Sequence, residues 1–348
     1  MRPISRRSFT LGGAAAGIMV AAGSLAGCGG SSAGSAERVT TVTTQLEYIF
    51  DVTFAGWYVA AQHGWFSQEG ISSRLLPYGA NIPSIAAVVA ARKADIGTSS
   101  IQEVIEANKQ GGDIIVFGTQ YQQSPGGLLS LAKNPVRTIH DVLGKRIGLD
   151  PSAQLVLNVC LDEAGLPHDY TYVSVSGDPE PLVLGRVDAM AVFITSQPIT
   201  LTLRGIPNVA VSFTKLGFPS YQNVLAARRE TLQSDPGLLV RYLRALIRGW
   251  ELNNANPTAG ATYTYQKYGT QSALNLKQQI LEDKEQVPLM VSALTARRGL
   301  FQMDLDNISG PQYEALSRSG VRNLPPVSSY VTLEILTEAY QGAKSLPD

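Results

Sequence analysis

The stretch VTTVTTQLEYIFDVTFAGWYVAAQHGWFSQEGISSRLLPY, residues 39–78, decides the fold because it places a strand, a helix and a second strand in close succession. Residues 39–47 are rich in β-branched side chains and favour a strand. Apolar side chains then recur at the spacing of one helix face, at Phe54, Trp57, Tyr58 and Ala61. Gly64 ends that helix, and residues 71–78 favour the second strand. This order is typical of a parallel sheet covered by helices.

The same alternation continues outward along the chain. Strand-like segments follow at residues 95–98, 114–119, 127–132, 145–149, 171–175, 189–194, 209–213 and 223–227. Helix-like segments lie between them, at residues 81–91, 100–110, 138–143, 152–164, 179–184 and 197–204. From Pro236 onward the pattern is almost entirely helical, over residues 238–255, 258–268, 272–283 and 328–344. We therefore expect an α/β fold with mostly parallel sheets, two lobes with a cleft between them, and a helical C-terminal segment.

Length and charge restrict the classes of protein to which the chain can belong. Its 348 residues include 28 basic and 28 acidic side chains, and three of the basic ones lie within the first 28 positions. The remainder is slightly acidic and has no basic run, which argues against a nucleic-acid partner. The sequence has no GxxxxGK[ST] phosphate loop, so any ATP hydrolysis belongs to another polypeptide. After residue 28 the only cysteine is Cys160, which is expected to be a small buried hydrophobe.

The first 27 residues have the pattern of a bacterial export signal. Three arginines precede an uncharged stretch at residues 11–26. This stretch is shorter than the about 20 apolar residues of a membrane-spanning helix. Residues 1–27 are therefore expected to be cleaved, and a retained anchor helix is the alternative. The sequence Ser5-Arg6-Arg7-Ser8-Phe9 resembles the twin-arginine export motif, which favours that route over general secretion.

A lipid-attachment motif follows the uncharged stretch. The sequence Leu25-Ala26-Gly27-Cys28 resembles a bacterial lipobox, in which the cysteine thiol receives diacylglycerol before cleavage. Residues 28–38 are rich in Gly and Ser, a composition typical of a flexible tether. The resemblance implies that lipidated Cys28 holds the folded body at the extracytoplasmic face of the cell membrane.

Six short motifs, in matching order, resemble those of the NMT1/THI5-like substrate-binding proteins. The first is Ala55-Gly56-Trp57-Tyr58-Val59-Ala60, which is followed by Gly64-Trp65-Phe66 and Glu69-Gly70-Ile71. The others are Tyr78-Gly79-Ala80, Ala94-Asp95-Ile96-Gly97, the stretch 141–148, Gly185-Arg186-Val187-Asp188-Ala189 and the stretch 235–257. Together the matches cover residues 39 to about 265.

This resemblance implies a two-lobed, type II periplasmic-binding-protein-like fold in which a hinge closes on the ligand. Residues 39–125 together with 222–348 are then expected to form one lobe, and residues 126–221 the other. The resemblance also implies an extracytoplasmic substrate-binding lipoprotein of an ABC importer. Such a protein hands a small molecule to a membrane permease that is driven by an ATPase subunit. No enzymatic activity, cofactor or metal is expected.

The segments at the predicted strand ends contain no Lys or Arg, which bears on the ligand. They are residues 47–58, 78–83, 97–103, 118–127, 149–156, 176–182, 192–198 and 216–224. Anionic ligands often recruit Arg, although helix N-termini at Ser100 and Ser152 can bind an anion through backbone N–H groups. The segments instead hold carboxylates and aromatic rings, which suit a flat, neutral or weakly basic heterocycle. Among ligands of the family, a thiamine-precursor pyrimidine is favoured, then a flavin, with sulfonate or nitrate as alternatives.

The predicted ligand-binding residues come from these segments. They are Asp51, Phe54, Trp57, Asn81, Ser99, Ser100, Gln120, Tyr121, Ser152, Asp178, Thr195, Gln197 and Tyr221. Several of them also have a structural interpretation. Trp57 lies on a helix face that suits the core equally well. Asn81, Ser100 and Ser152 suit helix caps, and Asp178 precedes a predicted helix start.

Two further functions compete with the importer interpretation. One branch of the resembling family consists of pyrimidine synthases that carry a Cys-rich CCCFC-type motif, and this sequence has no such cluster. A lipid-anchored sensor that feeds a signalling partner is the other possibility. Asp188 is expected to be structural, and the isolated His63, His140 and His168 are given no role because they lack metal-ligand spacing.

Overall fold

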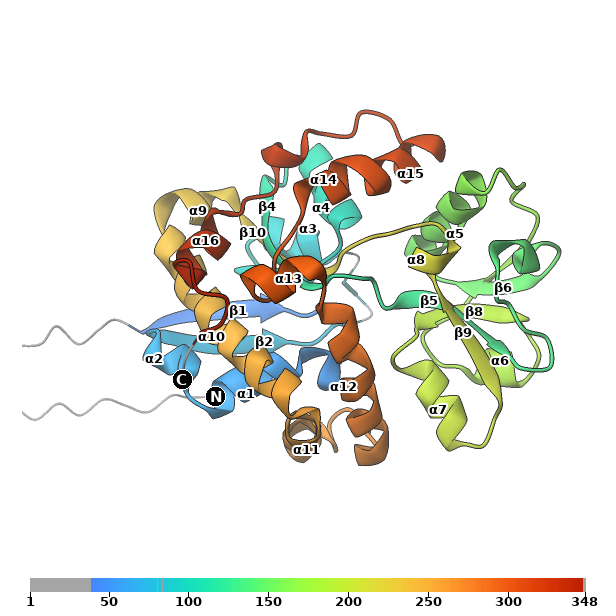
Figure 1. Ribbon diagram of the computed structural model, residues 1–348, viewed down its shortest axis with the longest axis horizontal. Coiled ribbons are helices and arrows are strands. Elements are labelled where there is room, and N and C mark those ends of the chain that lie inside the picture. The colour runs from blue at the N-terminus through green and yellow to red at the C-terminus, as the bar shows by residue number, and fades with distance from the viewer. Residues whose placement is uncertain (1–38, 80, 83, 347–348) are drawn as a thin grey trace, which may run out of the picture. The chain divides into compact units, whose positions relative to one another are not determined.

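The computed structural model describes residues 39–346 apart from positions 80 and 83. The predicted signal segment, Cys28 and the tether up to residue 38 lie outside the described residues. The described chain forms two five-stranded sheets, each with helices packed against it (Figure 1). The predicted α/β, two-lobed fold is therefore confirmed, and we refer to the part built on each sheet as the first and the second lobe.

The first lobe is built on the sheet β2-β1-β3-β10-β4. Its strands are β1 (Thr40–Gln45), β2 (Ile71–Leu76), β3 (Ile96–Ser99), β4 (Ile114–Tyr121) and β10 (Gln222–Arg228). Strand β1 is parallel to β2 and β3, whereas β10 is antiparallel to β3 and β4. The whole of β4 is buried although it ends the sheet, because Val331 pairs with Val116 along its outer edge.

The second lobe is built on the sheet β7-β6-β8-β5-β9. Its strands are β5 (Gly126–Leu131), β6 (Arg146–Leu149), β7 (Thr171–Ser174), β8 (Ala189–Phe193) and β9 (Asn208–Ser212). Strand β6 is parallel to β7 and β8, and β5 is antiparallel to β8 and β9. One strand is thus reversed in each sheet, and both sheets are mostly parallel, as predicted.

The two reversed strands, β5 and β10, are those by which the chain changes lobe. Residues 122–125 lead from β4 into β5, and residues 217–221 lead back into β10. The backbone N–H of Ser124 donates to the carbonyl of Ser220 at 3.0 Å, so the two links run side by side. The side chain of Gln122 also donates to the carbonyl of Gln302 at 2.7 Å, which ties the first link to the C-terminal part of the chain.

Helices cover the first sheet and extend it with a helical C-terminal part. They are η1 (Val52–Phe54), α1 (Ala55–Gln62), α2 (Trp65–Gln68), α3 (Ile85–Ala90), α4 (Ile101–Lys109), α9 (Arg229–Ser234), α10 (Pro236–Ala255), α11 (Pro257–Tyr268), α12 (Leu276–Met290), α13 (Ala293–Arg298), α14 (Leu305–Asn307) and α16 (Glu334–Tyr340). Within residues 39–346, leaving aside 80 and 83, none of the helices combines the length and apolar character needed to cross a bilayer.

Helices α1 and α10 pack closely at the centre of the first lobe. The indole N–H of Trp57 donates to the hydroxyl of Tyr242 at 2.7 Å, and the ring of Trp57 meets that of Trp250 edge-on at 6.2 Å between centroids. Gly56 and Gly249 lie where the helices cross. A Cβ on Gly249 would overlap the carbonyl oxygen of Gly56, so this approach requires glycine.

The second lobe has its own core and borrows one helix from the C-terminal part. Its helices are η2 (Ile139–Val142), α5 (Pro151–Glu163), α6 (Glu180–Val183), α7 (Gln197–Leu203) and α8 (Phe213–Leu216). Cys160 of α5 is fully buried in this core, as predicted, and burial raises the pKa of its thiol to about 12. Ala315 and Leu316 of α15 (Tyr313–Arg318) join the same apolar cluster. Helix α15 lies within the stretch 222–348 that the sequence assigns to the other lobe; the lobe boundaries themselves stay a prediction.

Two helices of the C-terminal part differ from the sequence prediction. The helix expected over residues 272–283 is α12, which begins later because Asn275 caps it by accepting from the N–H of Gln278 at 3.0 Å. The helix expected over residues 328–344 is reduced to α16. Its first part is instead a short 3-10 helix, η4 (Val327–Ser329), followed by residues 330–332, whose backbone hydrogen-bonds to Val116. Tertiary pairing therefore overrides the local helical preference there.

Candidate functional site

Asp51 lies in the loop after β1, in which the ring of Tyr48 also lies 6.5 Å from that of Phe193 in the second lobe. Its carboxylate accepts a hydrogen bond from the N–H of Thr53 at 3.0 Å and so caps η1. Asp51 is only 3% exposed. A buried carboxylate near the N-terminus of a short helix is partly compensated by backbone N–H groups, but this one also lies close to Glu282 of α12.

Glutamine side chains from α12 fix the position of η1. Gln279 accepts from the backbone N–H of Val52 at 2.9 Å, and Gln286 donates to the carbonyl of Val52 at 2.6 Å. The Tyr121 hydroxyl, at the end of β4, donates to Gln286 at 2.6 Å. Its neighbour Gln120 donates to the carbonyl of Thr53 at 2.9 Å. The end of β4, the turn at η1 and α12 thus form one connected polar network.

Four carboxyl groups with raised pKa values gather around this network. Burial raises the pKa of Asp51 to about 8, and the nearby Glu282 adds to the shift. Burial also raises the pKa of Glu47 to about 8, with a contribution from Glu103, and that of Asp283 to about 7. The pKa of Glu282 is raised by burial, although side-chain hydrogen bonds oppose the rise. Near neutral pH the site therefore retains protons, because ionising all four groups together in a buried place is unfavourable.

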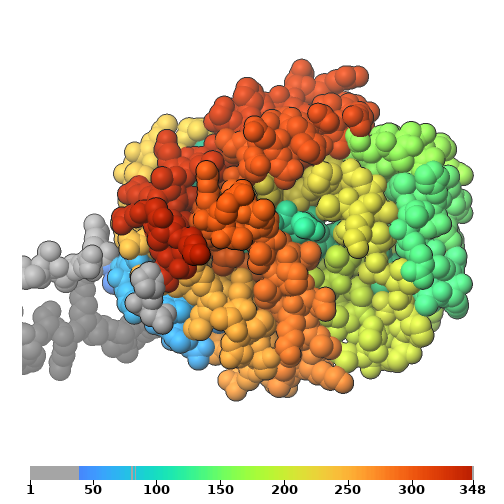
Figure 2. All heavy atoms as spheres, viewed as in Figure 1, coloured from blue at the N-terminus to red at the C-terminus, as the bar shows by residue number. Residues whose placement is uncertain are grey.

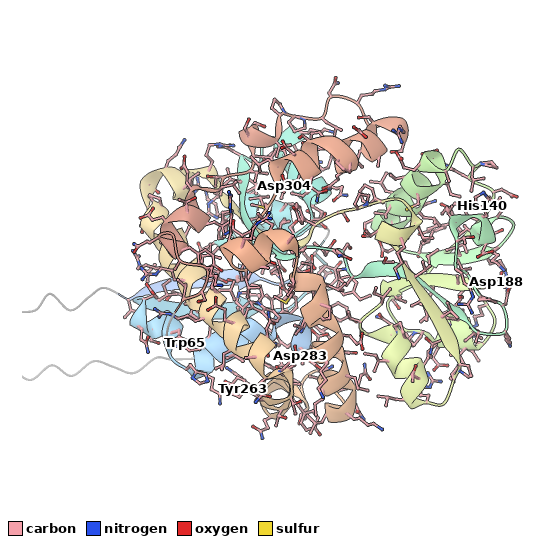
Figure 3. The ribbon with its side chains drawn as sticks, viewed as in Figure 1. Trp65, His140, Asp188, Tyr263, Asp283 and Asp304 are labelled. Carbon is pink, nitrogen blue, oxygen red and sulfur yellow. The ribbon has the colours of Figure 1, made fainter. Side chains whose placement is uncertain are left out.

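Basic side chains do not neutralise these carboxyls. In the part of the chain that the structure describes, each ion pair involves other acidic residues. The described carboxyl, His and Cys groups also form no cluster arranged to hold a metal ion. Figure 3 shows Asp283 on α12, whereas Asp188 lies on the second lobe. There Asp188 accepts two hydrogen bonds from the Arg146 guanidinium, the structural role expected for it.

The second lobe contributes the start of α7 to this region. Gln197 accepts from the N–H of Phe193 at 3.1 Å and donates to the carbonyl of Gly177 at 3.2 Å. The Phe193 ring lies 6.5 Å from that of Tyr48 in the first lobe, between centroids. Ser196 donates to Glu282 at 2.8 Å. Residues of both lobes therefore meet around the carboxyl cluster.

The structure brings only part of the predicted ligand-binding set together here. Asp51, Gln120, Tyr121 and Gln197 lie around the carboxyl cluster, and each is nine-tenths or more buried. Thr195 is also buried, two residues before Gln197. The ligand roles of these residues stay predictions.

Four other predicted residues pack in the core or hydrogen-bond to other residues of the protein. Phe54 and Trp57 are fully buried and stack edge-on at 5.7 Å between centroids, which favours the core interpretation that the helix face also allowed. The Ser99 hydroxyl donates to Glu103 at 2.8 Å. Tyr221 lies in the second link between the lobes, where its hydroxyl accepts from the N–H of Asp304 at 2.9 Å.

The structure confirms one of three expected helix caps and assigns the other two to different residues. Ser100 caps α4, as predicted, by accepting from the N–H of Glu103 at 3.2 Å. Two other expected caps were wrong. Ser84, not Asn81, caps α3, and Asp150, not Ser152, caps α5, because the carboxylate reaches two backbone N–H groups there. Asn81, Ser152 and Asp178 are all exposed.

The sequence analysis did not single out Ser196 or four site residues of α12, Gln279, Glu282, Asp283 and Gln286. These four residues of α12 form a polar stripe at helix positions i, i+3, i+4 and i+7. A stripe of this spacing is the available signal, but polar stripes usually face solvent, and here the stripe is buried.

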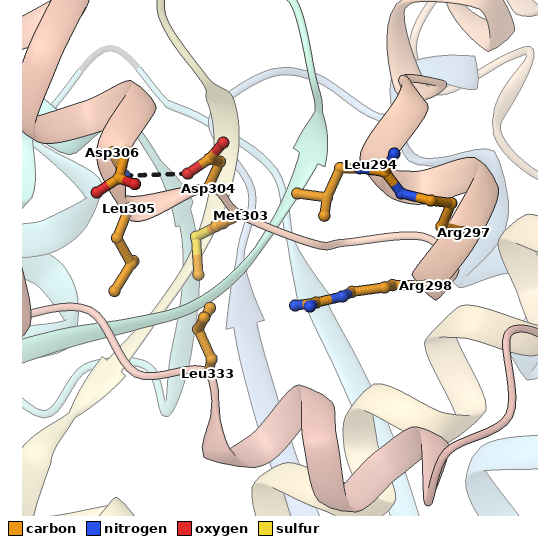
Figure 4. Close-up of a pocket in the computed structure, with 8 residues that line it drawn as sticks. All are labelled: Leu294, Arg297, Arg298, Met303, Asp304, Leu305, Asp306 and Leu333. Atoms are coloured by element: carbon orange, nitrogen blue, oxygen red, sulfur yellow. Dashed lines mark hydrogen bonds between the residues drawn. The ribbon is translucent and has the colours of Figure 1, made fainter.

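Two surface hollows are lined by other residues. The first, of about 510 Å³, is lined by Leu294, Arg297, Arg298, Met303, Asp304, Leu305, Asp306 and Leu333 (Figure 4). The second, of about 530 Å³, is formed between the end of α11 and the start of α12. Neither contains a predicted ligand-binding residue, and both have charged, exposed rims, so we assign them no role.

Comparison with known proteins places the chain among binding proteins and enzymes of one family. A family model described as NMT1/THI5 like matches residues 51–260. The riboflavin-binding protein RibY of Chloroflexus aurantiacus is 25% identical over 271 residues, which cover 76% of each chain. The formylaminopyrimidine-binding protein of Halalkalibacterium halodurans is 21% identical over 239 residues, 67% of this chain and 72% of that protein.

An enzyme and a solved structure complete the comparison. The 4-amino-5-hydroxymethyl-2-methylpyrimidine phosphate synthase of Schizosaccharomyces pombe is 26% identical over 203 residues, 54% of this chain and 58% of that enzyme. The alkanesulfonate-binding protein SsuA of Xanthomonas axonopodis pv. citri, solved with bound MOPS, superposes with a TM-score of 0.64. It is 17% identical and covers 85% of this chain and 99% of SsuA, so the likeness concerns the fold.

Proposed function

Because the chain belongs to the NMT1/THI5-like family, we propose that it is the extracytoplasmic substrate-binding lipoprotein of an ABC importer. It captures a small, flat heterocycle between its two lobes and delivers it to a permease driven by ATPase subunits. The favoured ligand is a thiamine-precursor pyrimidine. Relatives named for binding riboflavin and formylaminopyrimidine support this class of ligand.

The observation that carries the proposal is the cluster of buried carboxyls Asp51, Glu282 and Asp283, which pair with no Lys or Arg among the described residues. A protonated carboxyl group offers one donor and one acceptor side by side. An aminopyrimidine presents the complementary pair, because its amino group donates and the adjacent ring nitrogen accepts. Asp51, with a pKa raised to about 8, is the carboxyl best suited to this role, since it lies beside Glu282, which hydrogen-bonds to Ser196 of the second lobe. Tyr48 of the first lobe and Phe193 of the second lobe, with ring centroids 6.5 Å apart, supply aromatic faces.

The same cluster argues against sulfonate or nitrate as the ligand. Placing an anion beside Glu47, Asp51, Glu282 and Asp283 would raise their pKa values further, and no described Lys or Arg pairs with them. An enzyme of thiamine pyrimidine synthesis is the second candidate function, supported by the named synthase among the relatives. The missing Cys-rich cluster, with Cys160 buried and its thiol pKa raised to about 12, disfavours it.

Ligand class can be tested by a thermal-shift screen of the purified protein. The panel contains aminopyrimidines, flavins, sulfonates, nitrate and bicarbonate. A ligand present at 100 times its dissociation constant should stabilise the protein by about 2.7 kcal/mol. We expect aminopyrimidines to raise the melting temperature most. A response to oxyanions alone would contradict the heterocycle proposal, and steady turnover of any hit would favour the enzyme.

Membrane attachment through Cys28 is a separate part of the proposal. It rests on the lipobox-like sequence Leu25-Ala26-Gly27-Cys28 and the Gly- and Ser-rich tether that follows. Replacement of Cys28 by serine removes the thiol that would carry the lipid. We expect the Cys28→Ser protein to leave the membrane fraction on washing with high salt, whereas the parent protein is released only by detergent. Equal retention of both proteins would show that the anchor lies elsewhere.

A further inference from the structure

A partly buried hydrogen bond joins α12 of the first lobe to the start of α7 in the second lobe. The Ser196 hydroxyl donates to Oε1 of Glu282 at 2.8 Å. Ser196 immediately precedes α7, and Glu282 lies in the middle of α12. In Figure 2 the orange atoms of α12 lie against the yellow-green atoms around α7, and the two helices are in contact. The bond therefore lies on a direct contact between the lobes.

The Glu282 carboxylate is held in place by its own helix before the second lobe contributes. Gln278 donates to Oε1 at 2.7 Å, and Gln279 donates to Oε2 at 2.9 Å. Gln279 is itself fixed, since it accepts from the N–H of Val52. Glu282 is 4% exposed, so its side chain is presented to Ser196 in one orientation and with little competition from water. A hydrogen bond to a buried charged group is stronger than a neutral one.

Other contacts tie the lobes together without a buried polar group. Ala315 and Leu316 of α15 pack into the apolar cluster of the second lobe. Arg318 of the same helix pairs with Glu163 of α5 at 2.6 Å, but the arginine side chain is 58% exposed, and exposed ion pairs contribute little. The rings of Tyr48 and Phe193 lie 6.5 Å apart and can separate without leaving a buried group unpaired. Separation at Ser196, in contrast, removes one of three donors from a buried carboxylate.

We infer that the Glu282–Ser196 hydrogen bond is a latch that favours the form in which the two lobes meet. By fixing Ser196 it also holds the start of α7, where Gln197 hydrogen-bonds to Phe193 and Gly177. Glu282 and Ser196 are thus positioning residues for ligand capture. The effect on ligand affinity rests on the proposed function, whereas the effect on lobe opening does not. Loss of a hydrogen bond to a charged group is expected to shift the ratio of latched to open forms by about tenfold.

The latch can be measured by the distance between spin labels on the two lobes. In the full chain carrying Cys28→Ser, cysteines are introduced at exposed Lys133 of the second lobe and exposed Lys277 of α12. Cys160 is buried, so it should escape labelling. Pulsed electron spin resonance then gives the distribution of label distances in the ligand-free protein. We expect Ser196→Ala to move the distribution toward longer distances, and Ser196→Thr, which keeps the hydroxyl, to restore it in part.

The matched control is Thr202→Ala on the same helix. Its hydroxyl donates to the carbonyl of Pro198 at 2.8 Å, a bond within the second lobe alone, so the distance distribution should equal that of the parent. Ser196→Ala and parent distributions that coincide would overturn the latch. Longer distances in Ser196→Ala together with no binding of any aminopyrimidine would retain the latch and refute the proposed function. With a ligand that binds, Ser196→Ala should weaken affinity by up to about tenfold.

Discussion

Replacing Gly249 by alanine should leave the protein largely unfolded under conditions in which the parent is stable. In the interior of a helix, glycine to alanine normally stabilises by about 0.5–1 kcal/mol. Here the added methyl group would overlap the Gly56 carbonyl oxygen and lie 2.8 Å from the Cβ of Ala60. Helices α1 and α10 would have to separate. Because Trp57 and Trp250 fill the space beside the crossing, we expect a loss of more than about 3 kcal/mol.

Gly237→Ala is the control for this substitution, because it lies in the first turn of the same helix. The nearest atom to a Cβ there is the terminal nitrogen of Arg241 at 3.3 Å, and that flexible side chain can move. We expect a change of a few tenths of a kcal/mol or less. Urea denaturation followed by circular dichroism gives both values. A Gly249→Ala midpoint equal to that of the parent would show that the two helices can move apart at little expense.

The close contact of α1 and α10 could not be predicted from the sequence, although most of the fold could. The strand-like segments expected from the sequence match β1, β4, β6, β8 and β10 closely. Their order then predicted mostly parallel sheets, since strands separated by helices pair in parallel. Which residues touch across a helix pair depends on where the two helices cross, and periodicity does not specify this.

Local signals failed where tertiary contacts compete with them. Residues 328–333 have a helical pattern, but Val331 pairs with β4 instead. Asn81 and Ser84 are both suitable helix caps, and the structure selects Ser84. Its hydroxyl also donates to Glu103 at 3.3 Å, a contact between two helices that the sequence does not reveal.

The candidate site was predicted only in part, because some of its residues are brought together by tertiary contacts that local patterns do not show. Asp51, Gln120 and Tyr121 follow from strand ends, because strand ends of α/β sheets meet at one edge. Glu282 and Ser196 belong to helix α12 and to the residue before α7. A polar stripe on α12 indicates a solvent-exposed face unless the opposing lobe is known. Burial of that stripe is what raises the pKa values of Glu282 and Asp283, so the acidic character of the site emerged only from the assembled fold.

Raising the pH from about 5 to about 9 should lower the melting temperature of the ligand-free protein by several degrees. In the unfolded chain a carboxyl group titrates near pH 4. In the folded protein, burial raises the pKa of Asp51 to about 8 and that of Asp283 to about 7. The folded state therefore holds protons more tightly than the unfolded state. The contribution of these two groups to the free energy of unfolding is fully present below about pH 4. It is lost as the pH rises through their folded pKa values of about 7 and 8.

The loss of stability in a variant of Asp51 shows whether this carboxyl is responsible for the pH dependence. Asp51→Asn replaces the protonated acid by a neutral side chain of the same shape, so the contribution of residue 51 no longer changes with pH. We expect this variant to lose less stability than the parent between about pH 5 and 9, with a difference of about 4 kcal/mol, because about three pH units separate pH 5 from the folded pKa of about 8. The pKa of Glu47 is also raised to about 8 by burial, so the stability of the variant still decreases in part as the pH rises. Differential scanning calorimetry in buffers of constant ionic strength measures both slopes.

Asp141→Asn is the control, because the pKa of Asp141 is lowered in the folded protein whereas that of Asp51 is raised. Hydrogen bonds from the N–H groups of Arg137 and Thr138 lower the pKa of the exposed Asp141, so this group is ionised throughout the range and should leave the slope unchanged. A parent melting temperature that is constant or rises between pH 5 and 9 would mean that Asp51 is already ionised and compensated in the folded protein. The carboxyl at the meeting of the two lobes would then be an acceptor alone. It would suit a ligand that presents only donors, such as an alkylammonium, better than an aminopyrimidine.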